Sequence, residues 1–281
     1  MDLASIERPL RQLRKQLKAV DRDLAPKDVH KLRTRAHRVQ AIAAIGPEPP
    51  RHLLRCVDAI RKSAGKVRDL DAMRTHALTL AGESSPGSLP RLLRHMVKLR
   101  ARAAAQLSKT LDRHGDRLRG DLADYAHRLA AAFPSPGAAA SSAAPHRQNV
   151  QQLRRAVARL LREICLWPEL GESNLHDLRI KLKRVCIFSQ LLPDQDTAWL
   201  ASLKGAITQI GEWHDWRHLA TVAHETLDTV HDAPLLAKID AAAASRLTHA
   251  IASARSLRKQ PPAKAAPPRV EPCAASSHRA A

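Results

Sequence analysis

The chain has 281 residues, and its 47 lysine and arginine residues outnumber its 27 acidic residues, giving a net charge of +20 with histidine neutral. A field of that sign favours polyanionic partners, namely nucleic acid, an anionic membrane or polyphosphate. Aromatic residues make up only 2% of the chain, and its four cysteines lie far apart without a C-x-x-C pair, which argues against a disulfide framework and a cysteine-based zinc site.

Four helical patterns precede residue 133. They span residues 3–24, 28–45, 51–80 and 89–132. Alanine, leucine and arginine, all good helix formers, dominate these segments. Asp28 is a candidate N-cap for the second pattern, and the fourth has a candidate break at His114 and Gly115. The stretch GESSPGSLP, residues 82–90, predicts a turn-rich connector.

A stretch rich in Pro, Gly, Ser and Ala, residues 133–147, is typical of a linker. Four more helical patterns follow, the second of them with Ser173 or Asn174 as its cap. They span residues 148–166, 174 to the LLPD stretch at 191–194, 196–230 and 234–257. No segment alternates with a period of two, so the prediction is an all-α protein with four-helix halves at 1–132 and 148–258.

Two further expectations concern the ends of the chain and its surroundings. The tail, residues 259–281, is rich in Pro and Ala and is expected to be disordered. The first residues lack the apolar core of a secretory signal, and no stretch approaches the roughly 18 apolar residues of a membrane span. We therefore expect a cytoplasmic protein without a membrane partner.

A short basic motif occurs twice, 146 residues apart. The copies are VHKLRTRAHRV at residues 29–39 and LHDLRIKLKRV at residues 175–185. Histidine and arginine are identical at three matched positions, and the basic character is kept at two more. These pairs are His30 with His176, Arg33 with Arg179, Arg38 with Arg184, Arg35 with Lys181 and His37 with Lys183.

The same offset, without a gap, aligns a second motif, GKVRDLD at residues 65–71 with GEWHDWR at residues 211–217. It pairs a glycine, an aspartate and, further along, an arginine. The matched residues are Gly65 with Gly211, Asp69 with Asp215, and Arg100 with Arg246. One constant offset over roughly seventy residues indicates an internal duplication. The alternative is a coincidence of composition in a chain rich in Ala, Leu and Arg.

Each basic motif has a charged face and an apolar face when it is placed on a helix. At about 100° per residue, His30, Arg33, His37 and Arg38 fall within an arc of about 140°, opposite Val29 and Leu32. Like charges at this spacing repel and weaken a helix slightly. We call the charged face of each motif a basic ridge. Neither ridge contains an acid, so an anion is expected there, because guanidinium forks match phosphate oxygens. The alternative is a solvated basic face.

The two motifs resemble those of the CHAD family, α-helical domains named for their histidines. The resemblance rests on VHKLRTRAHRV and LHDLRIKLKRV, each followed by a glycine-then-Asp site, and it covers residues 3–258. It implies two four-helix bundles related by a pseudo-twofold axis, whose motif helices line a basic groove or pore for inorganic polyphosphate. His37, where the family usually shows Arg or Lys, and WHDWR, in place of an RD-type pair, depart from the family pattern.

The resemblance also implies a set of polyphosphate contacts. They are His30, Arg33, Arg35, His37, Arg38, Arg68, Arg100, His176, Arg179, Lys181, Lys183, Arg184, His214 and Arg246. Asp69 and Asp215 have two interpretations: they orient these bases by pairing with them, or they are N-caps after a helix break at the glycine. No triphosphatase domain is visible in the chain, so the expected role is binding, without catalysis, cofactor or metal.

Three other functions are compatible with parts of the sequence. The His-Asp pairs at His176, His214 and His231 are of a kind found in metal-dependent phosphohydrolases, but the duplication does not preserve the pair and the ridges are cationic. Nucleic-acid binding fits the charge, but few aromatic residues are available to stack on bases. A phosphoacceptor histidine needs less arginine than the two motifs carry. The favoured hypothesis is a polyphosphate-binding accessory protein, associated with polyphosphate granules or polyphosphate-metabolising enzymes.

Overall fold

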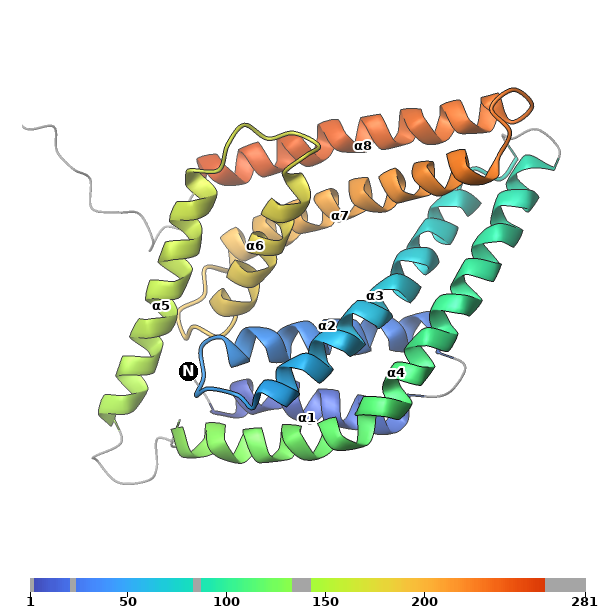
Figure 1. Ribbon diagram of the computed structural model, residues 1–281. Coiled ribbons are helices and arrows are strands. Elements are labelled where there is room, and N and C mark those ends of the chain that lie inside the picture. The colour runs from blue at the N-terminus through green and yellow to red at the C-terminus, as the bar shows by residue number, and fades with distance from the viewer. Residues whose placement is uncertain (1–2, 21–23, 83–86, 133–142, 261–281) are drawn as a thin grey trace, which may run out of the picture.

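The protein is described here by a computed structural model that covers residues 3–20, 24–82, 87–132 and 143–260. Every regular element in these ranges is a helix, which confirms the all-α prediction (Figure 1). The helices are α1 (Leu3–Ala19), α2 (Pro26–Ala43), α3 (Arg51–Leu78), α4 (Ser88–Ala132), α5 (Ala143–Cys165), α6 (Leu175–Ser189), α7 (Thr197–Thr226) and α8 (Ala233–Lys259). The linker at 133–142 and the tail from 261 lie outside the described residues, so their predicted disorder stays a prediction.

Several helix ends differ from the predicted ones. Helix α1 ends at Ala19, and α2 begins at Pro26 because proline fits the first turn of a helix, where no backbone N–H is needed. Asp28 is therefore not the N-cap; it lies in the first turn and accepts hydrogen bonds from Gln16 and Lys31. Asn174 does stand at the N-cap of α6. Helix α5 begins inside the predicted linker.

Helix α4 runs through the predicted break without interruption. Gly115 is buried within the helix, and the flanking Leu107 and Leu118 belong to the hydrophobic core, which offsets the cost of about 1 kcal/mol that glycine brings to a helix. Figure 1 nevertheless shows α4 bending part-way along its length. Its first part packs in one core cluster and its second part in another. Because the helix is continuous through Gly115, the break prediction is wrong, although the helix does change direction.

The buried apolar side chains form three clusters rather than one in each half. The first unites α1, α2, the start of α3 and the second part of α4. The second unites α5, α6, the start of α7 and the end of α8. The third lies where the far ends of α3 and α7 meet the starts of α4 and α8, and it includes Met73, Leu92, Trp216 and Leu235. The two halves thus share a core at their tips, unlike two self-contained four-helix bundles.

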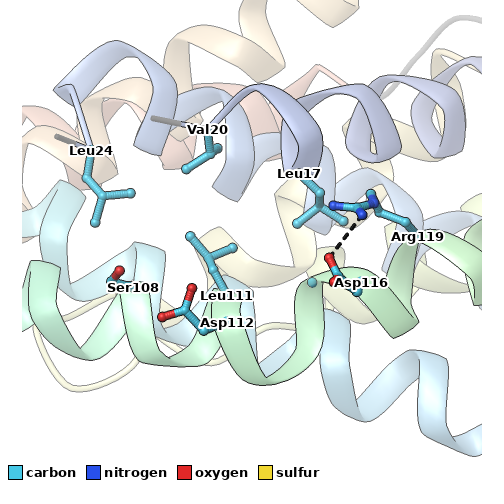
Figure 2. Close-up of a pocket in the computed structure, with 9 residues that line it drawn as sticks. Leu17, Val20, Leu24, Ser108, Leu111, Asp112, Asp116 and Arg119 are labelled. Carbon is cyan, nitrogen blue, oxygen red and sulfur yellow. Dashed lines mark ion pairs between the residues drawn. The ribbon is translucent and has the colours of Figure 1, made fainter. Parts of the chain in front are cut away.

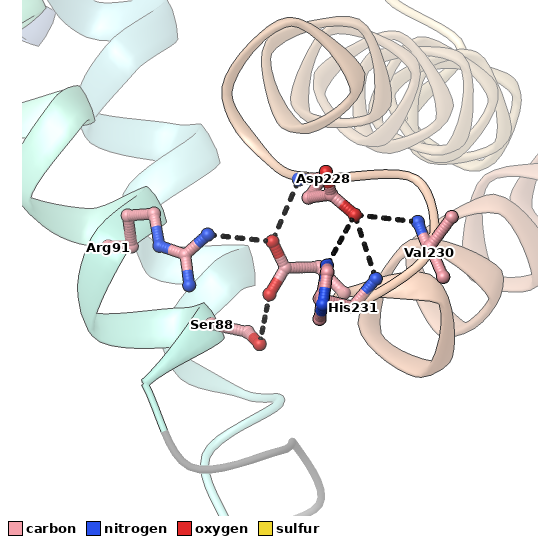
Figure 3. A network of polar contacts seen from close by, with 6 residues as sticks. Ser88, Arg91, Asp228, Val230 and His231 are labelled. Carbon is pink, nitrogen blue, oxygen red and sulfur yellow. Dashed lines mark hydrogen bonds and ion pairs between the residues drawn. The ribbon is translucent and has the colours of Figure 1, made fainter.

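A polar network joins the halves beside this third cluster (Figure 3). The Asp232 carboxylate accepts a hydrogen bond of 2.5 Å from Ser88 Oγ and one of 3.0 Å from Arg91 Nη1, both at the start of α4. It also accepts one of 2.8 Å from the backbone N–H of Asp228, in the loop between α7 and α8. Asp232 is almost fully buried, so these contacts fix the two tips together.

The helices that carry the repeated motifs lie nearer the middle of the molecule than the other four. Figure 1 shows α1, α4, α5 and α8 towards its edges, with α2, α3, α6 and α7 between them. Helix α2 contacts α6 and α3 contacts α7, so each motif helix of one half meets its counterpart in the other. This pairing decides where the two basic ridges go.

Candidate functional site

The two basic ridges converge on one place between the halves. Lys183 of α6 is close enough to Arg33 of α2, Arg68 of α3 and Arg179 of α6 for their charges to lower its pKa. The charges of Arg33 and Arg68 likewise lower the pKa of Arg179. We call this group the seam cluster. Its members are His30, Arg33, His37, Arg68, Asp69, His176, Arg179, Lys183, His214 and Asp215.

Burial and neighbouring cations lower the pKa values of several bases in the seam cluster. Burial lowers the pKa of Lys183 to about 7, and the charges of Arg179 and Arg33 add to the effect. Burial lowers the pKa of His37 to about 3, helped by Lys183 and Arg33. Burial also lowers the pKa of Arg179 to about 10. Each shift favours loss of a proton, so the site opposes its own positive charge.

Two carboxylates partly offset these cations, and both engage Arg68. Its Nη1 donates to Asp215 Oδ1 at 2.7 Å, across the boundary between the halves, and to Asp69 Oδ1 at 3.2 Å within α3. These carboxylates raise the pKa of Arg68, although burial opposes the rise. Both aspartates lie inside unbroken helices, so the N-cap interpretation is wrong. Their contacts fit the other interpretation, that they orient a base.

The repeated glycines make room for the repeated arginines. Gly65 and Gly211 are buried in the middle of α3 and α7. A Cβ atom on Gly211 would lie 2.6 Å from Arg179 Nη2, and one on Gly65 would lie 3.4 Å from Arg33 Nε. In each half, therefore, the arginine of the motif helix rests against the neighbouring helix where a side chain is missing. This contact explains why glycine and arginine recur together at one offset.

The second half adds a row of stacked histidines. His176 of α6 stacks on His214 of α7 with ring centroids 4.5 Å apart, and His214 lies 4.1 Å from His218. Burial lowers the pKa of His214 to about 3, and the neighbouring histidines contribute. The Nδ1 atom of His176 is buried without a hydrogen-bond partner. In the first half, His30 is exposed at the rim, where partial desolvation and Arg68 lower its pKa.

Not every residue implied by the resemblance lies in the seam cluster. Six make other contacts: Arg35 donates to Gln12 O at 3.1 Å and to Gln16, and Lys181 pairs with Glu163 beside the Trp167 ring. Arg100 pairs with Asp71 at 2.5 Å, and Arg246 pairs with Glu212 at 3.0 Å. Arg38 lies near Cys186, and Arg184 lies near Glu163. Arg35 and Lys181 are matched residues, and both turn towards the outer helix of their own half. Because this position contacts the outer helix in both halves, we interpret its role as structural.

Two residues that the sequence reading passed over lie close to the seam cluster. Arg61 of α3 adds to the positive field at Arg33 and His37. His218 contacts His214 one turn further along α7. The repeat pairs these residues with Ile207 and Ala72, so comparison of the two copies gave no sign of them. Their position on the same helix face as Gly65 and His214, four residues away, was the available signal.

Another hollow exists outside the seam cluster, between α1 and α4 (Figure 2). It measures about 270 Å³ and is lined by Leu17, Leu24, Leu111 and Asp112 among others, with an ion pair of 2.9 Å between Arg119 and Asp116. None of its lining residues belongs to a repeated motif.

The described part of the chain contains no group of three or more His, Cys, Asp or Glu side chains that could hold a metal ion. It likewise contains no helix long and apolar enough to span a membrane.

Comparison with known proteins identifies the family. The CHAD domain family model matches residues 4–224, most of the chain. The chain belongs to the CHAD family. The crystal structure of the CHAD domain from the plant Ricinus communis is similar in fold, with a TM-score of 0.66 over 92% of this chain and 90% of that chain, at 16% sequence identity. At that identity the likeness concerns the CHAD fold alone. No protein with a curated description matches the chain.

Proposed function

We propose that this CHAD protein binds inorganic polyphosphate at the seam cluster, without catalysing a reaction on it. The observation that carries the proposal is the convergence of two duplicated basic ridges on one place. Arg33, Arg179 and Lys183 come from both halves and lie close enough for their charges to act on one another, and Asp69 and Asp215 partly offset them. A string of phosphates would supply the negative charge that the site lacks.

The chemistry of the side chains suits phosphate in particular. Arg33 Nε is buried without a hydrogen-bond partner, which is a cost that an anion could remove. Guanidinium groups bind phosphate oxygens with two parallel hydrogen bonds, and Lys183 adds a point charge. A bound polyanion would also raise the pKa values of Lys183, His37 and His214, and so add positive charge where it is needed. Orthophosphate offers too few contacts to use both ridges.

The other candidate functions gain no support from the geometry. In the His-Asp pairs, Asp215 pairs with Arg68 and Asp232 with Ser88 and Arg91, so these carboxylates are engaged in structural contacts. Trp213 and Trp216 are buried in the cores and are not available to stack on nucleic-acid bases. We propose in addition that binding takes place in the cytoplasm, on polyphosphate granules or beside polyphosphate-metabolising enzymes.

The test is calorimetric titration with polyphosphate of defined length. Charge-assisted hydrogen bonds contribute about 1.5–3 kcal/mol each, so Arg33→Ala with Arg179→Ala should weaken binding at least about 100-fold. The matched control is Arg11→Ala with Arg14→Ala, which removes the same charge from the exposed face of α1. Affinity should rise with chain length, because the second ridge binds intramolecularly, and it should fall with salt. Equal losses in both double variants would show a diffuse charge effect and refute the site.

A further inference from the structure

The first half contains a basic pocket that extends beyond the repeated motifs. It measures about 610 Å³ and lies along one face of α3. Its basic lining residues are Arg33 from α2 and Arg61, Lys62 and Lys66 from α3, and Asp69 also faces it. We call it the α3 pocket. Gln106 places α4 on its opposite wall.

The α3 pocket and the seam cluster share a wall. Arg33 and Asp69 line the pocket and also belong to the cluster, where Arg33 feels the charges of Arg68, Asp69 and Asp215. Gly65, another lining residue, has no side chain that would separate Arg33 from the pocket. A polyanion bound to Arg33 therefore has a direct route from the cluster into the pocket.

The pocket keeps a surplus of positive charge. Arg61 and Lys62 share a single carboxylate, Asp58, at 2.6 Å and 2.8 Å. Lys66 is exposed, and no ion pair to it occurs within the described part of the chain. The pocket therefore presents a line of cations along α3, continuous with the arginine of the motif helix. Successive phosphates of a linear chain could contact such a line one after another.

The second half has no counterpart to this pocket. At the offset of 146 residues, Arg61, Lys62 and Lys66 correspond to Ile207, Thr208 and Glu212. The backbone carbonyl of Ile207 accepts a hydrogen bond from Arg179 Nε at 3.3 Å, and Glu212 pairs with Arg246. The three matching positions of α7 are thus apolar, neutral and acidic, so the basic line of α3 is not repeated there.

We infer that the α3 pocket binds the phosphates of a long polyphosphate chain that extend beyond the seam cluster, so that the ligand leaves the site along α3 and α4 and not along α7 and α8. This inference rests on the proposed function and assigns a direction to it. A short polyphosphate would be satisfied by the seam cluster alone. A long one would occupy both regions and gain affinity from the pocket.

The experiment compares two triple variants by calorimetry, with tripolyphosphate and with long-chain polyphosphate. Arg61→Gln, Lys62→Gln and Lys66→Gln empty the pocket of its α3 charge. Arg11→Gln, Lys15→Gln and Lys18→Gln remove one arginine and two lysines from the exposed face of α1. The pocket variant should bind the long chain at least about tenfold more weakly and tripolyphosphate within about twofold, because only the long chain reaches the pocket. The control should stay within about threefold for both ligands, because its three residues line neither the α3 pocket nor the seam cluster.

The outcomes separate the inference from the proposed function. Equal losses in the two triple variants, or equal losses for short and long chains in the pocket variant, would overturn the α3 pocket as an extension. No binding of either ligand by the wild-type protein would overturn the proposed function itself. Thermal unfolding checks that each variant is folded. If the pocket variant does not fold, the single change Lys66→Glu, at an exposed position, must show the same selective loss for the long chain.

Discussion

Arg33 and Arg179 occupy matching positions in the two halves, yet their surroundings differ. Arg179 is only 9% exposed, it donates to the carbonyl of Ile207, and it lies tightly over Gly211. Arg33 is half-buried, its Nε has no partner, and it lies less tightly over Gly65. The duplicated pattern is therefore used in two ways. One arginine is held by the protein, and the other lines a basic pocket.

The neighbouring positions differ in the same sense. The counterpart of His214 is Arg68, so one half places a titratable ring where the other places a permanent charge. Arg68 in turn reaches across to Asp215 of the other half. The comparison shows that the repeat keeps a basic residue type at these motif positions, while the pKa and the partner of each side chain are set locally. Three experiments break or sharpen this comparison.

The largest expected effect concerns the two repeated aspartates. Asp215, with a side chain only 5% exposed, compensates Arg68 and lies near Arg33 and Arg179. Asp215→Asn should lower the free energy of unfolding by about 3 kcal/mol in urea titrations, because it leaves buried cations unpaired. Asp69→Asn should cost about 1 kcal/mol, since Asp69 is more exposed and its contact with Arg68 is longer. Added polyphosphate should restore more stability to the first variant; equal losses in both would refute the unequal roles.

The second prediction concerns pH and the matched residues His37 and Lys183. The pKa of Lys183 is about 7 in the fold against 10.5 when unfolded, so the unfolded chain binds more protons between these values. Stability should therefore rise with pH across that window, by about 2 kcal/mol between pH 7 and about pH 9. For His37, with a pKa of about 3 against 6.5, the corresponding rise ends before pH 7.

Urea unfolding of the unliganded protein at several pH values measures this contribution. Lys183→Met removes the titrating group, so the extra rise above pH 7 should disappear from that variant. His37→Leu serves as the matched control and should change only the acidic part of the profile. A wild-type profile identical to that of Lys183→Met above pH 7 would contradict the buried, uncompensated position of Lys183.

The smallest expected effect concerns the two glycines. Gly211→Ala puts a Cβ atom 2.6 Å from Arg179 Nη2, so the guanidinium must move, and polyphosphate affinity should fall about tenfold, or about 1.4 kcal/mol. Gly65→Ala creates only an ordinary contact with Arg33, so affinity should stay within about twofold. Its helix should gain up to about 1 kcal/mol from the better propensity of alanine. Calorimetry and thermal unfolding measure the two effects, and similar affinities for both alanine variants would show that the tight contact is unimportant.

Much of the fold was predictable because each helix has its own local pattern of apolar residues. The periodicity of apolar residues gave all eight helices, with the errors at their ends and at Gly115. The start of α2 follows the preference of proline for the first turn of a helix, a signal that the sequence carries. Packing around Leu107 and Leu118 keeps α4 continuous, and single-residue propensities do not describe it. The third core was not predictable, because it depends on which parts of α3 and α7 meet.

The candidate site was predictable in outline and not in detail. The matched motifs identified Arg33, Arg179 and Lys183, because a duplicated charged face is visible at one offset. They could not show that Arg35 and Lys181 turn to the outer helices, since a position beside the ridge can face either way. They also missed Arg61, because the repeat comparison finds only features that both copies retain.

The shared core at the tips has a consequence for how either half would behave alone. Met73 and Leu92 from one half pack in the same cluster as Trp216 and Leu235 from the other. A single copy of the repeat, expressed alone, would expose its share of this apolar surface to water, and such patches drive association. We therefore expect one half, expressed alone, to associate through this surface.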